Sequence, residues 1–448
     1  MTPDQKRILE LENEIAILKR LVQQLIEENE RLKHPKNSRN SSVPPSKDEN
    51  RPFKTKSLRN SEGKSSGGQL GHEGTTLQMT SNPDFIIDHY PSICDRCGCD
   101  VSKVPSEQVV CRQVIDIPSI VPIYAEHRVF RTVCNCGHHV QASFPSGVNS
   151  PISYGSNVEA TIAYMHTRQF IPLERMSEYF ANVCNLPISQ GAICDILERF
   201  AQKAMPTYRL IAKDVECSTV VGSDETGAKV NGKRGWFWTW QSKLATFIAY
   251  SHNRGTATID ENFANGFENA VLVHDCWKSH FETNVQTHQI CTAHLLRELK
   301  FFEERYSSKW ASMFKLLLID ALKLKNNLTP IQYYEPINQR TEIEKRFEEL
   351  LLSSIDQNMK EVCTFQKRMI KYKNYLFTFL YYHDVPPDNN GSERAIRNIK
   401  VKQKVSGQFK TIRGAEIYAI IRSITDSCIK NQQNVLAAFA NIAKLQPV

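Results

Sequence analysis

The chain has 448 residues, a formal net charge of +8 and a hydrophobic fraction of 41%. A chain of this length is expected to form two or three domains and to bury a sizeable core. The charged N-terminus lacks the apolar stretch of a secretory signal peptide, and no window of about 18 apolar residues occurs. We therefore expect an intracellular protein with no membrane partner, which excludes secreted and membrane-spanning proteins.

The first 34 residues carry a heptad pattern. The a positions hold Ile8, Ile15 and Val22, and the d positions hold Leu11, Leu18, Leu25 and Leu32. β-Branched residues at a with leucine at d predict a parallel coiled coil over residues 1–34, and hence a homodimer or higher oligomer. Asn29 is the one polar residue of the seam, where a buried amide fixes the register. The alternative is an amphipathic helix on the chain's own core, but the narrow apolar stripe favours the coiled coil.

Positive charge is concentrated in two stretches. Between Arg31 and Lys64 there are ten Lys or Arg residues and three acids, and between Arg394 and Arg422 there are eight against one acid. Dense cationic stretches suit DNA, because each neutralised phosphate releases counterions. The alternative is that both stretches are simply solvated. The first one falls in residues 35–82, which are rich in Ser, Asn, Lys, Pro and Gly and predict a flexible basic linker.

Residues 83–145 form a predicted cysteine module. The chain has thirteen cysteines, and in a reducing compartment the isolated ones are expected to be buried thiols and the clustered ones metal ligands. Two close pairs predict a structural Zn²⁺ site with four thiolates, from Cys94, Cys97, Cys134 and Cys136. The second pair is tighter than usual, so the ligand set stays open, and the possible substitutes are Cys99, His138 and His139. Incidental cysteines are the alternative.

Residues 146–216 show helical spacing of apolar residues, with breaks at Pro172 and Pro187. This segment is expected to connect the cysteine module to the rest of the chain, or to contact DNA. Ordinary core packing is the interpretation we favour.

The pattern becomes mixed α/β from about Cys217. Short β-rich runs at 218–222, 236–240, 245–250, 270–274 and 288–291 predict five strands, and Asn231-Gly232 predicts a hairpin between the first two. Helices are expected at 256–267 and from about Ala293, and a short helix after the fourth strand is left open. These elements predict an α/β domain over residues 217–410 with a helical part at about 300–380, followed by a helical segment at 411–448.

Three carboxylates are candidates for a metal site. Asp224 follows the first predicted strand and Asp275 follows the fourth, so neighbouring strands would bring them together. Glu393 would lie in the first turn of a late helix, capped by Asn390 or Ser392. Carboxylates in contact repel each other unless a cation lies between them, and Mg²⁺ or Mn²⁺ suits such oxygen ligands in a two-metal site. The alternatives are surface aspartates and a glutamate that merely stabilises a helix start.

Further residues near these acids need an interpretation. Glu225 is expected on the opposite strand face from Asp224, outside the ligand set or exposed. His294 is expected to pack near the catalytic face rather than to bind zinc with Cys291. The late helix is expected to contact DNA through its basic residues Arg394, Arg397, Lys400, Lys402 and Lys404.

Several motifs together carry a family resemblance. They are the heptads, Lys36-Asn-Ser-Arg-Asn-Ser-Ser-Val-Pro-Pro-Ser-Lys-Asp48, Gly67-Gly-Gln-Leu-Gly-His-Glu-Gly74, Asp224-Glu-Thr-Gly227 with Trp236-Phe-Trp238, Val273-His-Asp275, Ala293-His-Leu-Leu-Arg-Glu298 and Asp388-Asn-Asn-Gly-Ser-Glu-Arg-Ala-Ile-Arg397. In order and spacing, the chain resembles insertion-sequence-66 family transposases over nearly its whole length.

The resemblance implies a ribonuclease-H-like catalytic core with a helical insertion, preceded by a coiled coil and a small zinc module. It selects Asp224, Asp275 and Glu393 as a DDE triad. It implies cleavage and joining of the element's DNA ends and target DNA in a bacterial cytoplasm, with accessory transposition proteins as possible partners. Two alternatives stay open: a DNA-binding protein with an inactive transposase-like core, and a nuclease that cuts without joining.

Overall fold

The computed structural model describes residues 3–37, 40–41, 48–49, 77–145, 147–148 and 150–446. The chain divides into two compact units, one of residues Pro52–Val121 and one of Met1–Arg51 with Pro122–Val448. The boundary at Val121 falls inside the predicted cysteine module. The glycine-rich box at 67–74 and most of the predicted basic linker lie outside the described residues.

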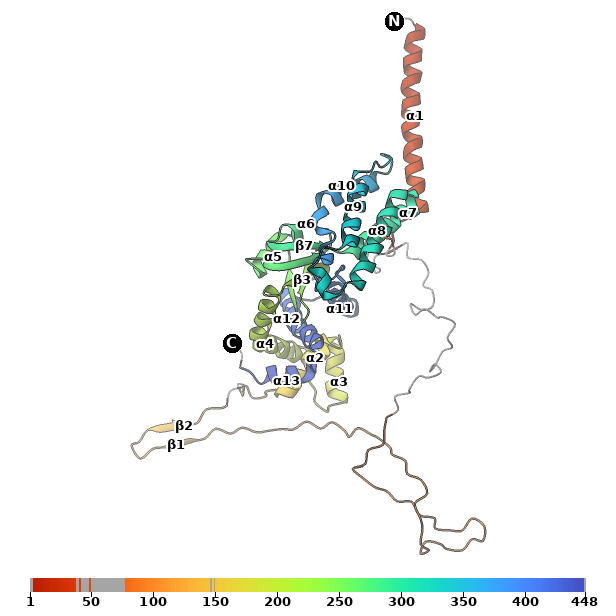
Figure 1. The fold of residues 1–448 in the computed structure, drawn as a ribbon. Coiled ribbons are helices and arrows are strands. Elements are labelled where there is room, and N and C mark those ends of the chain that lie inside the picture. Colours follow the sequence, from red (N-terminus) through yellow and green to blue (C-terminus); the bar gives the residue numbers. More distant parts are fainter. Residues whose placement is uncertain are drawn as a thin grey trace. The chain divides into compact units, whose positions relative to one another are not determined.

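The heptad region forms one long helix, α1 (Pro3–Lys33), drawn in red in Figure 1. The helix is therefore confirmed. Its apolar seam is exposed in the single chain, with about half of each side chain open to solvent: Ile8 56%, Ile15 50%, Leu18 59% and Val22 54%. The coiled-coil partner stays a prediction.

A five-stranded mixed sheet forms the centre of the larger unit. β3 (Val220–Val230), β4 (Lys233–Gln241) and β5 (Thr246–Ser251) are antiparallel, and β6 (Phe267–His274) and β7 (Val285–Ile290) run parallel to β3. The strand order is β5-β4-β3-β6-β7. Asn231 and Gly232 both have positive φ (48° and 74°), as the predicted two-residue hairpin requires. The predicted α/β class is confirmed.

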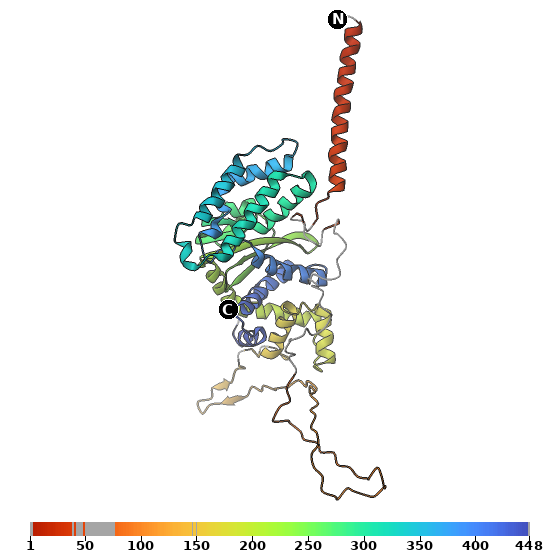
Figure 2. The same cartoon turned by 45° about the vertical axis from the view of Figure 1, so that its right-hand side comes forward.

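One hydrophobic core is shared by the sheet, the helices that precede it in the chain and the last two helices that follow it. α2 (Ser156–Thr167), α3 (Leu173–Asn182), α4 (Gln190–Glu216), α12 (Ile412–Lys430) and α13 (Val435–Ala443) pack together. Buried Trp238, Trp240 and Phe247 supply the sheet's side of this core. α4 and α12 lie side by side (Figure 2). The predicted helical segments at 146–216 and 411–448 thus share a core with the sheet, in line with ordinary core packing.

A second core lies under the helices between β7 and residue 385. α7 (Thr292–Tyr306), α8 (Lys309–Asn327), α9 (Asn338–Leu352) and α10 (Lys360–Lys371) pack on Val271, Val273 and Ile290 of the parallel strands. Shorter elements complete this part of the chain: α5 (Thr256–Asn262), α6 (Lys278–Phe281) and 3₁₀ turns at Pro330–Tyr333, Lys373–Tyr375 and Thr378–Leu380. The chain then returns to the sheet as α11 (Asn390–Ser406).

In the part of the chain that the structure describes, we find no helix with the length and apolarity that a bilayer crossing requires.

Candidate active site

The register of the parallel strands brings Asp224 and Asp275 to the same level. Gly222 on β3 is paired with Val273 on β6, and the same offset places Asp224 opposite Asp275. Asp275 follows β6 directly, as predicted. Asp224 does not follow a strand, because β3 continues to Val230 through its pairing with β4. The acid nevertheless lies just beyond the parallel part of the ladder, where polar side chains of α/β sheets collect.

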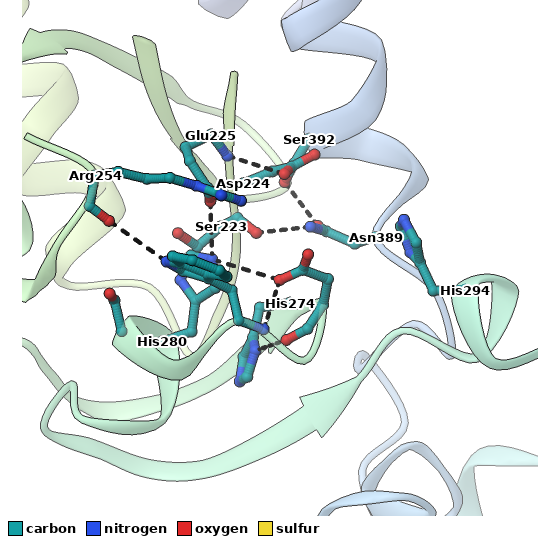
Figure 3. Close-up of polar contacts among 12 residues, drawn as sticks. Ser223, Asp224, Glu225, Arg254, His274, His280, His294, Asn389 and Ser392 are labelled. Atoms are coloured by element: carbon teal, nitrogen blue, oxygen red, sulfur yellow. Dashed lines mark hydrogen bonds and ion pairs between the residues drawn. The ribbon is translucent and has the colours of Figure 1, made fainter. Parts of the chain in front are cut away.

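α11 docks on β3 beside Asp224. Its first residues are bonded to the strand: the Asn389 side-chain amide donates to the carbonyl of Ser223 (2.7 Å), and the Ser392 hydroxyl donates to Asn389 Oδ1 (2.7 Å) (Figure 3). A Cβ atom at Gly222 would lie 2.8 Å from both Asn389 Oδ1 and Ser392 Oγ, so glycine permits this close approach. The helix thereby brings Glu393, in its first turn, to the face of the sheet that Asp224 shares with Gly222.

The start of α11 differs from the prediction. The residue before the helix is Asn389, and it makes no side-chain capping bond. Ser392 is fully buried against β3, and Asn390 is exposed. The predicted cap by Asn390 or Ser392 is therefore wrong, because the helix begins at Asn390 and both residues lie inside its first turn.

Asp224 carries an unfavourable charge in this environment. Burial raises its pKa well above the usual value, the charges of Glu225 and Asp275 raise it further, and Glu393 adds to them. One hydrogen bond acts in the opposite sense, since the N–H of Glu225 donates to Asp224 Oδ1 (2.9 Å). The N–H of Trp277 donates a hydrogen bond to Asp275 Oδ1 (2.9 Å). A buried carboxylate whose pKa is raised by neighbouring carboxylates is stabilised by a hard divalent cation, so these residues fit one.

Glu393 has two further neighbours on α7. Its Oε1 lies 3.2 Å from an Arg297 terminal nitrogen and 3.8 Å from His294 Nδ1. That imidazole nitrogen is buried and makes no hydrogen bond among the described residues. Glu393, His294 and Cys291 form a group with ligand atoms within 4.8 Å of one another. Burial raises the pKa of the Cys291 thiol to about 11. The structure thus places His294 where the sequence suggested.

Glu225 belongs to a buried network on the other face of β3. It is cross-strand paired with Trp238, and its side chain is 2% exposed, so the alternative of an exposed residue is wrong. Arg254 donates to it from Nε (2.9 Å), and His280 Nε2 lies 3.3 Å from it and 3.9 Å from Asp275 Oδ1. Burial would raise the pKa of Glu225, but His280 and Arg254 outweigh burial and lower it.

Neither this network nor the contact of Asn389 with β3 could be predicted from the sequence. Arg254 stacks on the ring of Trp277 at 3.6 Å and on that of Trp236 at 4.6 Å. Neither Arg254 nor His280 lies in a recognisable motif. His280 reaches the site from α6, and Arg254 reaches it from the segment before α5.

Comparison with known protein families identifies the family to which the chain belongs. The family model described as "Transposase IS66 family" matches residues 151–417, which include all three carboxylates. The chain belongs to the IS66 family of transposases. A second model, described as a family of unknown function (DUF6444), matches residues 1–78. No curated protein matches the chain.

The basic residues of α11 in this IS66-family chain fall into two groups. Arg394, Arg397 and Lys404 are exposed. Lys400 donates to the carbonyl of Gly227, and Lys402 is only 4% exposed, with its Nζ 3.3 Å from His166 Nδ1 on α2. Burial lowers the pKa of Lys402 to about 8. The prediction that Lys402 contacts DNA is therefore corrected, because its ammonium group lies inside the protein.

The predicted zinc ligands lie in two turns of similar form. The N–H of Gly98 donates to the carbonyl of Cys94 (2.9 Å), and the N–H of Gly137 donates to that of Cys134 (2.8 Å), each glycine having positive φ (72° and 85°). The Cys134–Cys136 turn joins β1 (Arg131–Val133) to β2 (His139–Gln141). Hydrogen bonds from backbone N–H groups lower the pKa of Cys97 and of Cys134, which favours thiolates. The two pairs belong to different units, so the four-thiolate site with Cys94, Cys97, Cys134 and Cys136 stays a prediction.

Proposed function

We propose that this chain is a DDE transposase that cleaves DNA at the ends of its insertion element and joins them to target DNA. The carboxylates of Asp224, Asp275 and Glu393 would hold divalent ions, Mg²⁺ or Mn²⁺. The observation that carries the proposal is the charge of Asp224, which burial and the carboxylates of Glu225, Asp275 and Glu393 make unfavourable without a cation.

The strand order supports a ribonuclease-H-like core. Three antiparallel strands are followed by two parallel ones, in the order β5-β4-β3-β6-β7, with one acid on the central strand and one after the adjacent strand. Helices α8, α9 and α10 then stand between the second acid and α11, as a helical insertion would. We infer the ribonuclease-H-like assignment from this topology together with the family.

The residues around the proposed metal site have different roles. Bound divalent ions would activate water or a 3′-hydroxyl and stabilise the leaving oxygen. Backbone N–H groups of Glu225 and Trp277 orient Asp224 and Asp275. Arg297, next to Glu393, supplies a positive charge that a phosphate oxygen can share. His294 presents an imidazole nitrogen beside the same carboxylate.

DNA would lie along the exposed cations of α11. Arg394, Arg397 and Lys404 are open to solvent on the helix that carries Glu393, and they suit phosphate contacts that position the duplex. We propose that the cysteine module binds structural Zn²⁺ and contributes to end binding. We further propose that α1 forms a coiled-coil dimer able to hold two element ends, in a bacterial cytoplasm where accessory transposition proteins can take part.

The test replaces each carboxylate by its isosteric amide. Asp224→Asn, Asp275→Asn and Glu393→Gln should each abolish cleavage of DNA carrying matched element ends, while end binding in a gel-shift assay stays within about twofold. Asp260→Asn, an exposed acid on α5, is the matched control and should keep full activity. Cleavage retained in any one triad variant would remove that residue from the metal site.

The same substrate separates the two alternative functions. Strand joining by the unaltered chain supports the transposase. Cleavage without joining identifies a nuclease, and end binding without cleavage identifies a DNA-binding protein with an inactive core.

A further inference from the structure

The residues that follow α1 contact the helices behind the catalytic site. Asn40 and Ser41 are buried (3% and 7% exposed), although the surrounding sequence predicts an open linker. They line one pocket together with α7 and α10, whose contributing residues are Glu298, Phe301, Phe302, Lys360, Glu361, Thr364, Phe365 and Arg368. Lys36 lines the same pocket.

A local turn prepares Asn40 for this contact. The N–H of Asn37 donates to Asn40 Oδ1 (2.8 Å), and the Ser41 hydroxyl donates to the carbonyl of Asn37 (2.6 Å). The other end of the Asn40 amide donates to Glu304 Oε2 on α7 (2.8 Å). Asn40 therefore uses both halves of its side chain, one within the turn and one on the core. An ionised carboxylate of the same shape could accept in the turn but has no N–H to donate to Glu304.

Lys36 makes the second anchor. Its ammonium lies 2.7 Å from Glu361 Oε1 on α10 and 5.0 Å from the centre of the Phe301 ring on α7. Glu361 also contacts Arg305 (3.3 Å) and accepts from the Tyr306 hydroxyl (2.9 Å), so the position of its carboxylate does not depend on Lys36 alone. The two anchors thus reach both α7 and α10.

We propose that Lys36, Asn37, Asn40 and Ser41 form a docking element that binds its own chain's groove between α7 and α10 and ties the N-terminal helix to the catalytic core. The element lies within the part of the chain that matches a family of unknown function, and it gives that part a role. α7 carries both Arg297, the partner of Glu393, and Glu304, the partner of Asn40. Docking therefore holds the helix on which the third carboxylate's surroundings depend. The proposal does not rest on the proposed chemistry, because its test measures a contact rather than activity.

Zero-length cross-linking of the full-length protein with a carbodiimide tests the contact. This reagent joins an amine to a carboxylate only where they touch, and Lys36 with Glu361 meets that condition. The pair Lys315–Glu303 (2.5 Å) is an internal positive control within the same helical region. The sample mixes ¹⁴N-labelled and ¹⁵N-labelled chains that were unfolded and refolded together, and peptide mass spectrometry reads each cross-linked pair. We expect a Lys36–Glu361 product in which both peptides carry the same label.

Asn40→Asp supplies the perturbation. It keeps the acceptor and the shape but places a second carboxylate against Glu304, so the docked fraction should fall relative to the undocked one by about tenfold or more. The Lys36–Glu361 product should decrease accordingly, and the Lys315–Glu303 product should not. Asn326→Asp, an exposed residue near the end of α8, is the matched control and should change neither.

Three results would overturn the proposal. They are the absence of the Lys36–Glu361 product while the control pair forms, an undiminished product in Asn40→Asp, and a product with mixed labels. The last result would mean that the turn binds a neighbouring copy.

Discussion

Gly222 offers the sharpest test of how α11 brings Glu393 to the sheet. In Gly222→Ala the new methyl would lie 2.8 Å from Asn389 Oδ1 and Ser392 Oγ, where ordinary contacts begin at 3.4 Å. α11 would have to withdraw by the difference, 3.4 − 2.8 = 0.6 Å, or more. Neither neighbour can turn away at no cost, because both are buried and bonded to each other. Overpacking of this kind costs about 1–3 kcal/mol in the free energy of unfolding.

The effect on chemistry should exceed the effect on stability. A displacement approaching 1 Å of a catalytic group lowers rates by roughly 100-fold. We expect Gly222→Ala to remain folded in urea titrations and to lose about that factor in the cleavage rate on matched element ends. Gly227→Ala lies on the same strand, where a methyl would be 3.4 Å or more from its neighbours, so it should keep the parental rate. Equal cleavage rates in the two variants would refute the inference that Gly222 sets the position of α11.

Three further predictions concern charges and metal. Glu225→Gln should lower the free energy of unfolding by about 2 kcal/mol, because the charged bonds to Arg254 and His280 are lost; an unchanged urea midpoint would contradict this. Lys402→Met should stabilise the chain by up to about 3 kcal/mol at pH 7, since the buried ammonium, with its pKa lowered from 10.5 to about 8, is penalised below pH 8. The unaltered chain regains this free energy of unfolding as the pH rises from 8 to 10.5, because Lys402 then loses its proton. If Lys402→Met were still more stable than the unaltered chain above pH 10.5, the buried charge would not be the cause. Protein purified without chelator should hold about one zinc per chain and lose it in Cys94→Ser/Cys97→Ser, which elemental analysis measures.

The elements of the sheet were predictable because their signals are local. The hairpin at Asn231-Gly232 follows from two residues that tolerate positive φ, and the position of Asp275 follows from an apolar run that ends in an acid. The extent of β3 was not predictable. Its polar second half, from Ser223 to Lys229, is a strand because β4 pairs with it, and that pairing is tertiary information.

Lys402 shows why the exposure of the cations on α11 could not be predicted from the sequence. A run of cations on one helix indicates a phosphate-binding surface, yet the helix turns each residue toward a different neighbour. Lys402 is turned toward His166, 236 positions earlier in the chain. Single-sequence periodicity contains no information about that contact, so exposed Arg394 and buried Lys402 have the same appearance in the sequence.

The ion pair between Arg297 and Glu393 bears on how this site accepts a metal. Both side chains are more than a quarter exposed (29% and 27%), and pairs this accessible to water contribute at most about 1 kcal/mol. A divalent ion that relieves the repulsion around Asp224 offers Glu393 a stronger partner than the guanidinium does. At the proposed metal site, Glu393 could therefore leave Arg297 at little cost, and the freed guanidinium would be available to a phosphate oxygen. The Arg297–Glu393 pair is thus compatible with the proposed metal site, because it holds Glu393 close to Asp224 and Asp275.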